Sequence, residues 1–253
     1  MPGLRKLEGR WFVKKLPQPP PDATIRLRLE TLIISDLALS MFCRSFDRTP
    51  AIWLDIGSLR RLELIGPTEN LLNIDSGHWE ELFASQSIEE VALKLFDYRH
   101  STILRLVFHK ATQLRVLEMT TSYGQWPLPR SAANGIDRPW CYPVLRQLTL
   151  SPNLLDPVLD LATFPSLAVL RVDWRAMPSS LGVSPSERLG CLLDMLRGRI
   201  TNRPRRFPGL RAVCLLPTPE FIASEASRKE TIKKLAALGL SLVDEDDRVL
   251  SLE

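Results

Sequence analysis

The residues with the most obvious chemistry are five arginines within ten positions: Arg197, Arg199, Arg203, Arg205 and Arg206. Such a cluster can neutralise the phosphates of a nucleic acid, and its binding would depend steeply on salt. No aromatic residue lies between the arginines to stack on bases, and Gly198 and Pro204 favour a solvated loop. Nucleic-acid binding through residues 197–206 is therefore an alternative and not the main prediction.

No motif of a known catalytic type stands out in the sequence. There is no glycine-rich phosphate-binding loop, no GxGxxG, no GxSxG nucleophile elbow and no HExxH pair. His78, His100 and His109 fall on apparent helical segments, where a surface or packing role is the simplest interpretation. We predict no enzyme activity, no catalytic residue and no cofactor.

Four cysteines are scattered along the chain: Cys43, Cys141, Cys191 and Cys214. None belongs to a CxxC pair and no histidine stands at zinc-finger spacing, so neither a metal site nor a disulfide framework is predicted. We expect the cysteines to be buried free thiols.

The composition is that of an ordinary globular protein. The 253 residues are 45% hydrophobic and 25% charged, and 33 basic against 29 acidic residues give a net charge of +4, which identifies no partner. No apolar run approaches the ~20 residues needed to span a bilayer, and the N-terminus has no apolar signal segment. These features predict an intracellular protein, cytoplasmic or nuclear, that does not bind membranes.

A phrase of three aliphatic residues recurs along the chain and is clearest at Leu59, Leu62 and Leu64. First positions of the copies are 4, 29, 59, 88, 114, 145, 167 and 210, and most of the steps between them are near the ~20–29 residues of a leucine-rich repeat. The copy from Leu145 also carries Asn153 and Leu155, which complete the pattern LxxLxLxxNxL. The chain is therefore expected to be an array.

Each phrase alternates apolar and variable residues as a short strand does. Helical patterns separate the phrases, at 36–46, 78–84, 101–109, 153–161, 186–197 and 227–238. Strand and helix in succession imply a parallel sheet. We predict an α/β leucine-rich-repeat solenoid, a horseshoe with a parallel concave sheet, convex helices and irregular repeat lengths.

Prolines mark the junctions between repeats. Pro143, Pro165 and Pro208 each stand two residues before a strand leucine, where they end the preceding helix, and the aromatic residue before each can cover the hydrophobic edge. We expect a single domain over 1–253 with a polyproline connector at 16–21, a loop at 126–142 and a long insertion at 175–206. Residues 226–253, with an acidic turn at 244–247, are expected to form a C-terminal cap.

The first phrase begins at Leu4, which leaves the first strand without an element to cover its edge. We expect that a covering segment lies upstream or on another chain.

The variable positions between the aliphatic residues point to the concave face, where equivalent residues of neighbouring strands form rows about 4.8 Å apart. These rows mix acidic, basic and small residues, which suits a polar protein epitope better than a phosphate backbone. The candidate protein-binding residues are Arg61, Glu63, Glu90, Lys94, Glu118, Thr120, Gln147, Thr149, Arg171 and Asp173.

The PxLRxLxL phrase at 143–150, the irregular step lengths and the tryptophan-containing linkers together resemble the leucine-rich-repeat region of fungal F-box-like proteins. The resemblance implies the substrate-recognition part of a ubiquitin-ligase receptor, in which an N-terminal F-box docks on the Skp1 adaptor of a cullin ligase. We find no F-box before the first repeat, so Skp1 and cullin are expected partners only with an upstream F-box. A scaffold or sensor unrelated to ubiquitin is the alternative.

Overall fold

The computed structural model describes residues 6–9, 27–28, 30–35, 54–55, 58–66, 87–94, 107, 112–121, 140–173, 185–202, 206–216 and 225–251. They fall into two compact units, Met1–Leu114 and Arg115–Glu253. The polyproline connector at 16–21, the expected helices at 36–46 and 78–84 and the three histidines lie outside the described residues. A single domain over 1–253 stays a prediction.

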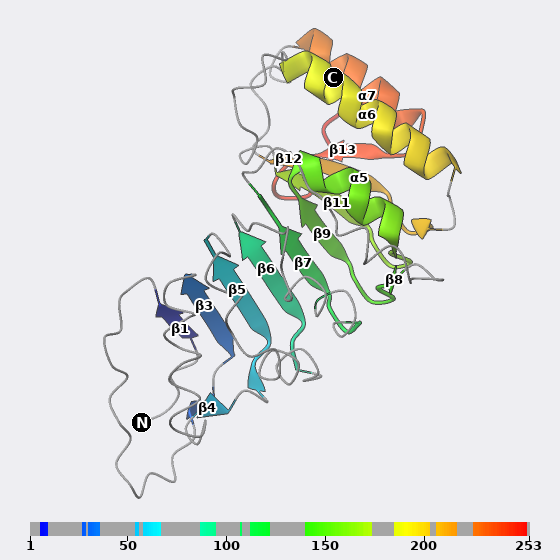
Figure 1. Ribbon diagram of the computed structural model, residues 1–253. Coiled ribbons are helices and arrows are strands. Elements are labelled where there is room, and N and C mark those ends of the chain that lie inside the picture. Colours follow the sequence, from blue (N-terminus) through cyan, green and yellow to red (C-terminus); the bar gives the residue numbers. More distant parts are fainter. Residues whose placement is uncertain are drawn as a thin grey trace, which may run out of the picture. The chain divides into compact units, whose positions relative to one another are not determined.

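The first unit contains a parallel sheet built from the aliphatic phrases (Figure 1). Its strands, paired in this order, are β1 (Lys6–Gly9), β3 (Thr31–Ser35), β5 (Arg61–Ile65) and β6 (Glu90–Lys94). A short parallel pair joins β2 (Leu27–Arg28) to β4 (Leu54–Asp55). Equivalent aliphatic residues face one another across β5 and β6, where Leu62 pairs with Val91 and Leu64 with Leu93. All four are buried, so the phrase supplies the core of this unit.

The second unit repeats the arrangement. Its strands, again parallel and paired in this order, are β7 (Val116–Met119), β9 (Gln147–Leu150), β11 (Val169–Asp173), β12 (Ala212–Leu216) and β13 (Ser241–Val243). A second short parallel pair joins β8 (Trp140–Cys141) to β10 (Ala162–Thr163). The α/β class and the parallel sheet are therefore as predicted.

The described residues of the second unit form the helices α5 (Pro152–Leu161), α6 (Pro185–Asn202) and α7 (Glu225–Ala236). Helix α5 packs against β9 and α6, and α7 packs against β13 (Figure 1). The apolar stripe predicted for 186–197 is buried on α6, at Leu189, Leu192, Leu193 and Leu196. Close after α7, Gly239 adopts a φ of +73°, as expected of a helix terminator.

Helix α6 is longer than the sequence indicated. It continues to Asn202, so Arg197 and Arg199 lie on a helix and not in a loop. A glycine in a helix interior costs only about 1 kcal/mol, so Gly198 alone does not break the helix. Pro204 comes after the helix ends at Asn202.

The proline turns before β9, β11 and β12 stack on one another. In each turn a leucine N–H donates to the carbonyl of the aromatic residue three positions earlier, in the pairs Leu145 and Tyr142, Leu167 and Phe164, and Leu210 and Phe207. The Tyr142 and Phe164 ring centroids are 5.5 Å apart, and those of Phe164 and Phe207 are 6.0 Å apart. All three rings are buried and stacked, so the aromatic residue before each proline joins the core.

Candidate protein-binding face

The candidate site is the sheet surface formed by the variable residues of each phrase, which we name the variable face. In the first unit β5 and β6 contribute Arg61, Glu63, Ile65, Glu90, Ala92 and Lys94. In the second unit they contribute Val116, Glu118, Gln147, Thr149, Val169, Arg171, Asp173, Ala212, Cys214, Leu216, Ser241 and Val243. Parallel register places the middle residues side by side: Glu63 with Ala92, and Glu118, Thr149, Arg171, Cys214 and Val243 in one row.

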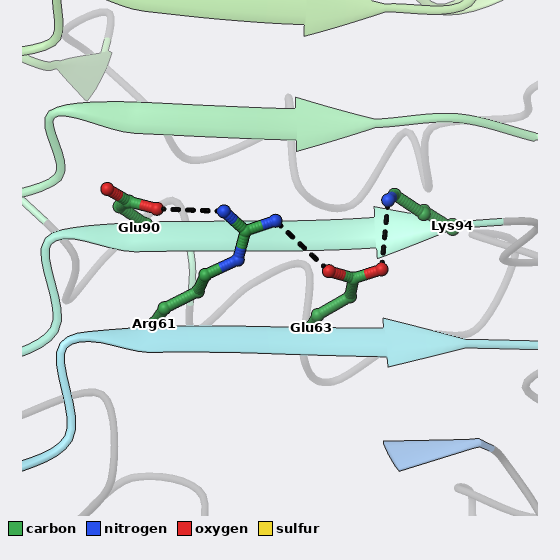
Figure 2. Close-up of polar contacts among 4 residues, drawn as sticks. All are labelled: Arg61, Glu63, Glu90 and Lys94. Carbon is green, nitrogen blue, oxygen red and sulfur yellow. Dashed lines mark hydrogen bonds and ion pairs between the residues drawn. The ribbon is translucent and has the colours of Figure 1, made fainter. Parts of the chain in front are cut away.

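Four predicted residues of the first unit form one network of ion pairs across β5 and β6 (Figure 2). Lys94 Nζ lies 2.9 Å from Glu63 Oε1, and Arg61 Nη2 lies 3.2 Å from Glu63 Oε2. The other guanidinium nitrogen, Arg61 Nη1, lies 3.2 Å from Glu90 Oε2. Two cations and two anions therefore balance one another on this part of the variable face.

Glu63 is the centre of this network, and its side chain is only 9% exposed. Burial alone would raise the pKa of Glu63, but the hydrogen bonds from Lys94 and Arg61 outweigh burial and leave the pKa below its ordinary 4.5. The side chains around it remain open to solvent, with Arg61 43%, Glu90 41% and Lys94 33% exposed. The carboxylate of Glu63 thus anchors a ring of accessible charges.

The expected exposure of the variable face is wrong for several polar residues. Glu63, Thr120, Thr149 and Asp173 are buried. For Glu63 the physical reason is that Arg61 on its own strand and Lys94 on the next one hydrogen-bond its carboxylate, so it does not need water as a partner. The burial of these polar residues leaves less polar surface for a partner than the sequence pattern suggested.

Ser151, which is also buried, shows how hydrogen bonds satisfy a buried polar side chain. Its Oγ accepts a hydrogen bond from the Thr121 N–H at 3.2 Å and donates to Asn153 Oδ1 at 2.7 Å. Asn153 is the residue that completes the longest repeat pattern, and here it orients a buried hydroxyl beside the first turn of α5. The repeat asparagine therefore has a structural role in this copy.

Arg171 is covered by the acidic turn, which we define as residues Asp244 to Arg248. Arg171 Nη2 lies 2.7 Å from Asp247 Oδ1, and Nη1 donates to the Glu245 carbonyl at 3.1 Å. The Arg171 side chain is consequently only 12% exposed. A second contact holds the start of the turn, since Cys214 Sγ donates to the Asp244 carbonyl at 3.2 Å. The acidic turn thus lies on the variable face of β11 and β12.

An apolar floor surrounds this contact. Ala212, Cys214 and Val243 are buried together, with Val169 and Leu216 packed against them. Burial raises the pKa of the Cys214 thiol to about 11; Arg171 opposes the shift, and Asp247, Glu245 and Asp244 add to it. This thiol is therefore protonated at neutral pH.

Sequence reasoning did not include Cys214 or Asp247 in the candidate site. Cys214 occupies the same variable position of its phrase as Arg171, and the register Arg171 to Cys214 follows from aligning the two phrases. That alignment would have placed Cys214 beside Arg171 in the candidate site. Nothing in the repeat pattern would have brought Asp247 to Arg171, because the two residues are 76 positions apart.

Two members of the arginine cluster bind the end of α5. Arg199 Nη1 lies 2.7 Å from Asp160 Oδ1, and Arg206 Nη1 donates to the carbonyls of Leu159 and Asp160. Cations at the carboxyl end of a helix satisfy its terminal carbonyls and interact favourably with the negative end of its dipole. Arg197 is exposed on α6, and Arg203 and Arg205 lie outside the described residues.

The cysteines are only partly as expected. Cys214 is buried, but Cys141 and Cys191 are exposed, so the expectation of burial is wrong for these two. Both fall at positions that face outward from β8 and α6, and Cys43 lies outside the described residues. Within the described residues, no group of three His, Cys, Asp or Glu side chains could hold a metal ion.

Across the same residues, no helix is long and apolar enough to cross a membrane. No family model matches the chain, and neither a curated protein nor a solved structure is similar enough to count as a match.

Proposed function

We propose that the chain is a non-catalytic leucine-rich-repeat solenoid that binds a protein partner on its variable face. The observation that carries this proposal is the register. Successive phrases stack aliphatic residue on aliphatic residue, as with Leu117, Leu148 and Leu170, and so set their variable residues side by side on the opposite face. Stacked repeats of this kind form extended surfaces that recognise proteins in many unrelated molecules.

The chemistry of the first unit favours a polar protein epitope. Arg61, Glu90 and Lys94 are accessible and of mixed sign, and each already has an ion-pair partner. A partner with complementary charges can exchange these intramolecular pairs for intermolecular ones, which gives specificity more than affinity. The phosphates of a nucleic acid would instead be repelled by the carboxylates of Glu63 and Glu90, which lie beside Arg61 and Lys94.

The role of a ubiquitin-ligase receptor is supported by the resemblance to fungal F-box-like proteins alone. Its test is co-purification of the Skp1 adaptor and a cullin with the protein tagged at its own genomic locus. Recovery of both at near-equal amounts is expected for a receptor. Their absence, with another partner recovered, would favour a scaffold or sensor unrelated to ubiquitin.

The arginine cluster is the weaker alternative, because Arg199 and Arg206 already bind α5. Nucleic-acid binding would be lost on replacing Arg197, Arg203 and Arg205 by glutamine, a triple variant that leaves both of these contacts in place. If the unaltered protein binds neither RNA nor DNA at low salt, this alternative is excluded.

The proposed binding face is tested by quantitative affinity purification with matched variants. Glu90→Lys reverses an accessible charge on the variable face, and Lys233→Glu reverses an exposed charge on α7 as the control. Lys233→Glu should shift stability by less than about 0.5 kcal/mol, and Glu90→Lys, which sets a second cation opposite Arg61, should cost up to about 1 kcal/mol. We expect Glu90→Lys to lose a partner that Lys233→Glu retains. Equal recovery with both variants would contradict this binding face.

A further inference from the structure

We propose that the acidic turn is an internal occupant of the variable face, and that an acidic peptide segment of the partner replaces it at Arg171. The inference rests on the proposed function and names the chemistry of the partner. The turn lies over two strands of the predicted binding face through contacts to Arg171 and Cys214.

The tip of the turn is held to β11 and β12 by few interactions, while its ends form a hairpin with β13, in which Val249 bridges Val243 and the Leu250 N–H donates to the Leu242 carbonyl. One ion pair, one bond to a backbone carbonyl and one weak thiol bond connect it to β11 and β12. Residues Glu245 to Val249 are exposed, and the Asp247 side chain is 50% exposed. Because the Asp247 side of the ion pair is open to water, a competing carboxylate can exchange with Asp247 at Arg171.

The surface beneath the turn has the chemistry of a site for an acidic ligand. Among the described variable-face residues of the second unit, Arg171 is the only cation. It stands beside the apolar floor of Ala212, Cys214 and Val243. A carboxylate with an adjacent aliphatic side chain would match this combination.

The internal contact also leaves part of the guanidinium unused. The turn engages Nη1 and Nη2 of Arg171 separately, and the buried Nε has no hydrogen-bond partner among the described residues. A carboxylate that binds Nε and Nη2 together would form the bidentate pair that arginine favours. Replacing the turn by such a ligand satisfies a donor that the turn does not reach.

The probe is a fluorescein-labelled peptide with the chain's own sequence from Leu240 to Glu253, titrated into the full chain and followed by anisotropy. Asp247→Asn removes the ion pair that holds the turn, so this variant should bind the peptide about fivefold more tightly than the unaltered chain. Adding Arg171→Gln to that variant should abolish binding. A peptide with its acidic residues replaced by Asn and Gln should not bind.

Equal affinity of the unaltered chain and Asp247→Asn would overturn the inference, as would binding that persists with Arg171→Gln or no peptide binding by any variant. Arg171→Lys, which keeps the charge but loses the bidentate fork, serves if Arg171→Gln does not fold. Failure here leaves the effect of Glu90→Lys on partner recovery untouched, because Glu90 lies in the other unit. The two proposals can thus fail separately.

Discussion

Arg171 and Asp247 are 76 positions apart in the chain, yet Arg171 Nη2 lies 2.7 Å from Asp247 Oδ1. This ion pair ties the middle of β11 to the turn that follows the last strand. Between them, Cys214 donates its thiol hydrogen to the first residue of the same turn. Arg171, which the repeat pattern places on the predicted binding face, is thus already paired within the molecule.

The thiol of Cys214 should report whether the turn is closed. With its pKa raised from 9.0 to about 11, its thiolate population at pH 8 is about a hundredfold below that of an ordinary thiol. We expect maleimide to label Cys191, which is exposed, long before Cys214, as measured by mass spectrometry of peptides. Asp247→Asn should speed the labelling of Cys214 and leave Cys191 unchanged. Labelling of Cys214 as fast as Cys191 in the unaltered chain would disprove this.

Glu63 should make the stability of the protein depend on pH. Its pKa is lower in the folded protein than its ordinary 4.5, so the ionised carboxylate stabilises the fold above about pH 4.5, and this stabilisation is lost as the pH falls through the folded pKa. Glu63→Gln should lower the free energy of unfolding at pH 6 by about 1 kcal/mol. Urea unfolding between pH 6 and 3 should show this difference shrinking. Glu90→Gln, at an accessible position, is the control, and a difference that stays constant with pH would count against the network.

Gly209 should not tolerate a side chain. A Cβ there would lie 2.9 Å from the Pro165 carbonyl oxygen and 3.2 Å from that of Leu167, both of them backbone atoms in the stacked proline turns. Gly209→Ala should therefore destabilise the protein by about 1–3 kcal/mol. The matched change Gly190→Ala falls on α6 with open space around it and should stabilise by up to about 1 kcal/mol. Thermal unfolding measures both, and a neutral Gly209→Ala would mean that the turns can move apart.

Much of the strand arrangement was predictable because it depends on a local pattern. The aliphatic residues of each phrase, such as Leu62 and Leu64, are buried where their alternation places them, and equivalent phrases pair in register. The aromatic residue before each proline was likewise predictable, since a fixed turn directs it to the same place in each repeat, as at Tyr142 and Phe164.

The candidate site was less predictable, because it depends on contacts between distant residues. The burial of Glu63 follows from Lys94, a residue on the next strand, and that of Arg171 from a turn that no repeat pattern relates to it. Helix α6 also passes Gly198, since the energy that packing gives the apolar stripe exceeds the cost of one glycine.

If the variable face binds a protein partner, site-specific photo-crosslinking from that face should capture it. Benzoylphenylalanine would replace Glu90 or Gln147 on that face, and Lys233 on the exposed side of α7 as the control. After irradiation in cells, mass spectrometry identifies what is attached at each position. We expect a protein to be crosslinked from Glu90 or from Gln147 and not from Lys233. Crosslinking of that protein from Lys233 alone, or equally from all three positions, would contradict it.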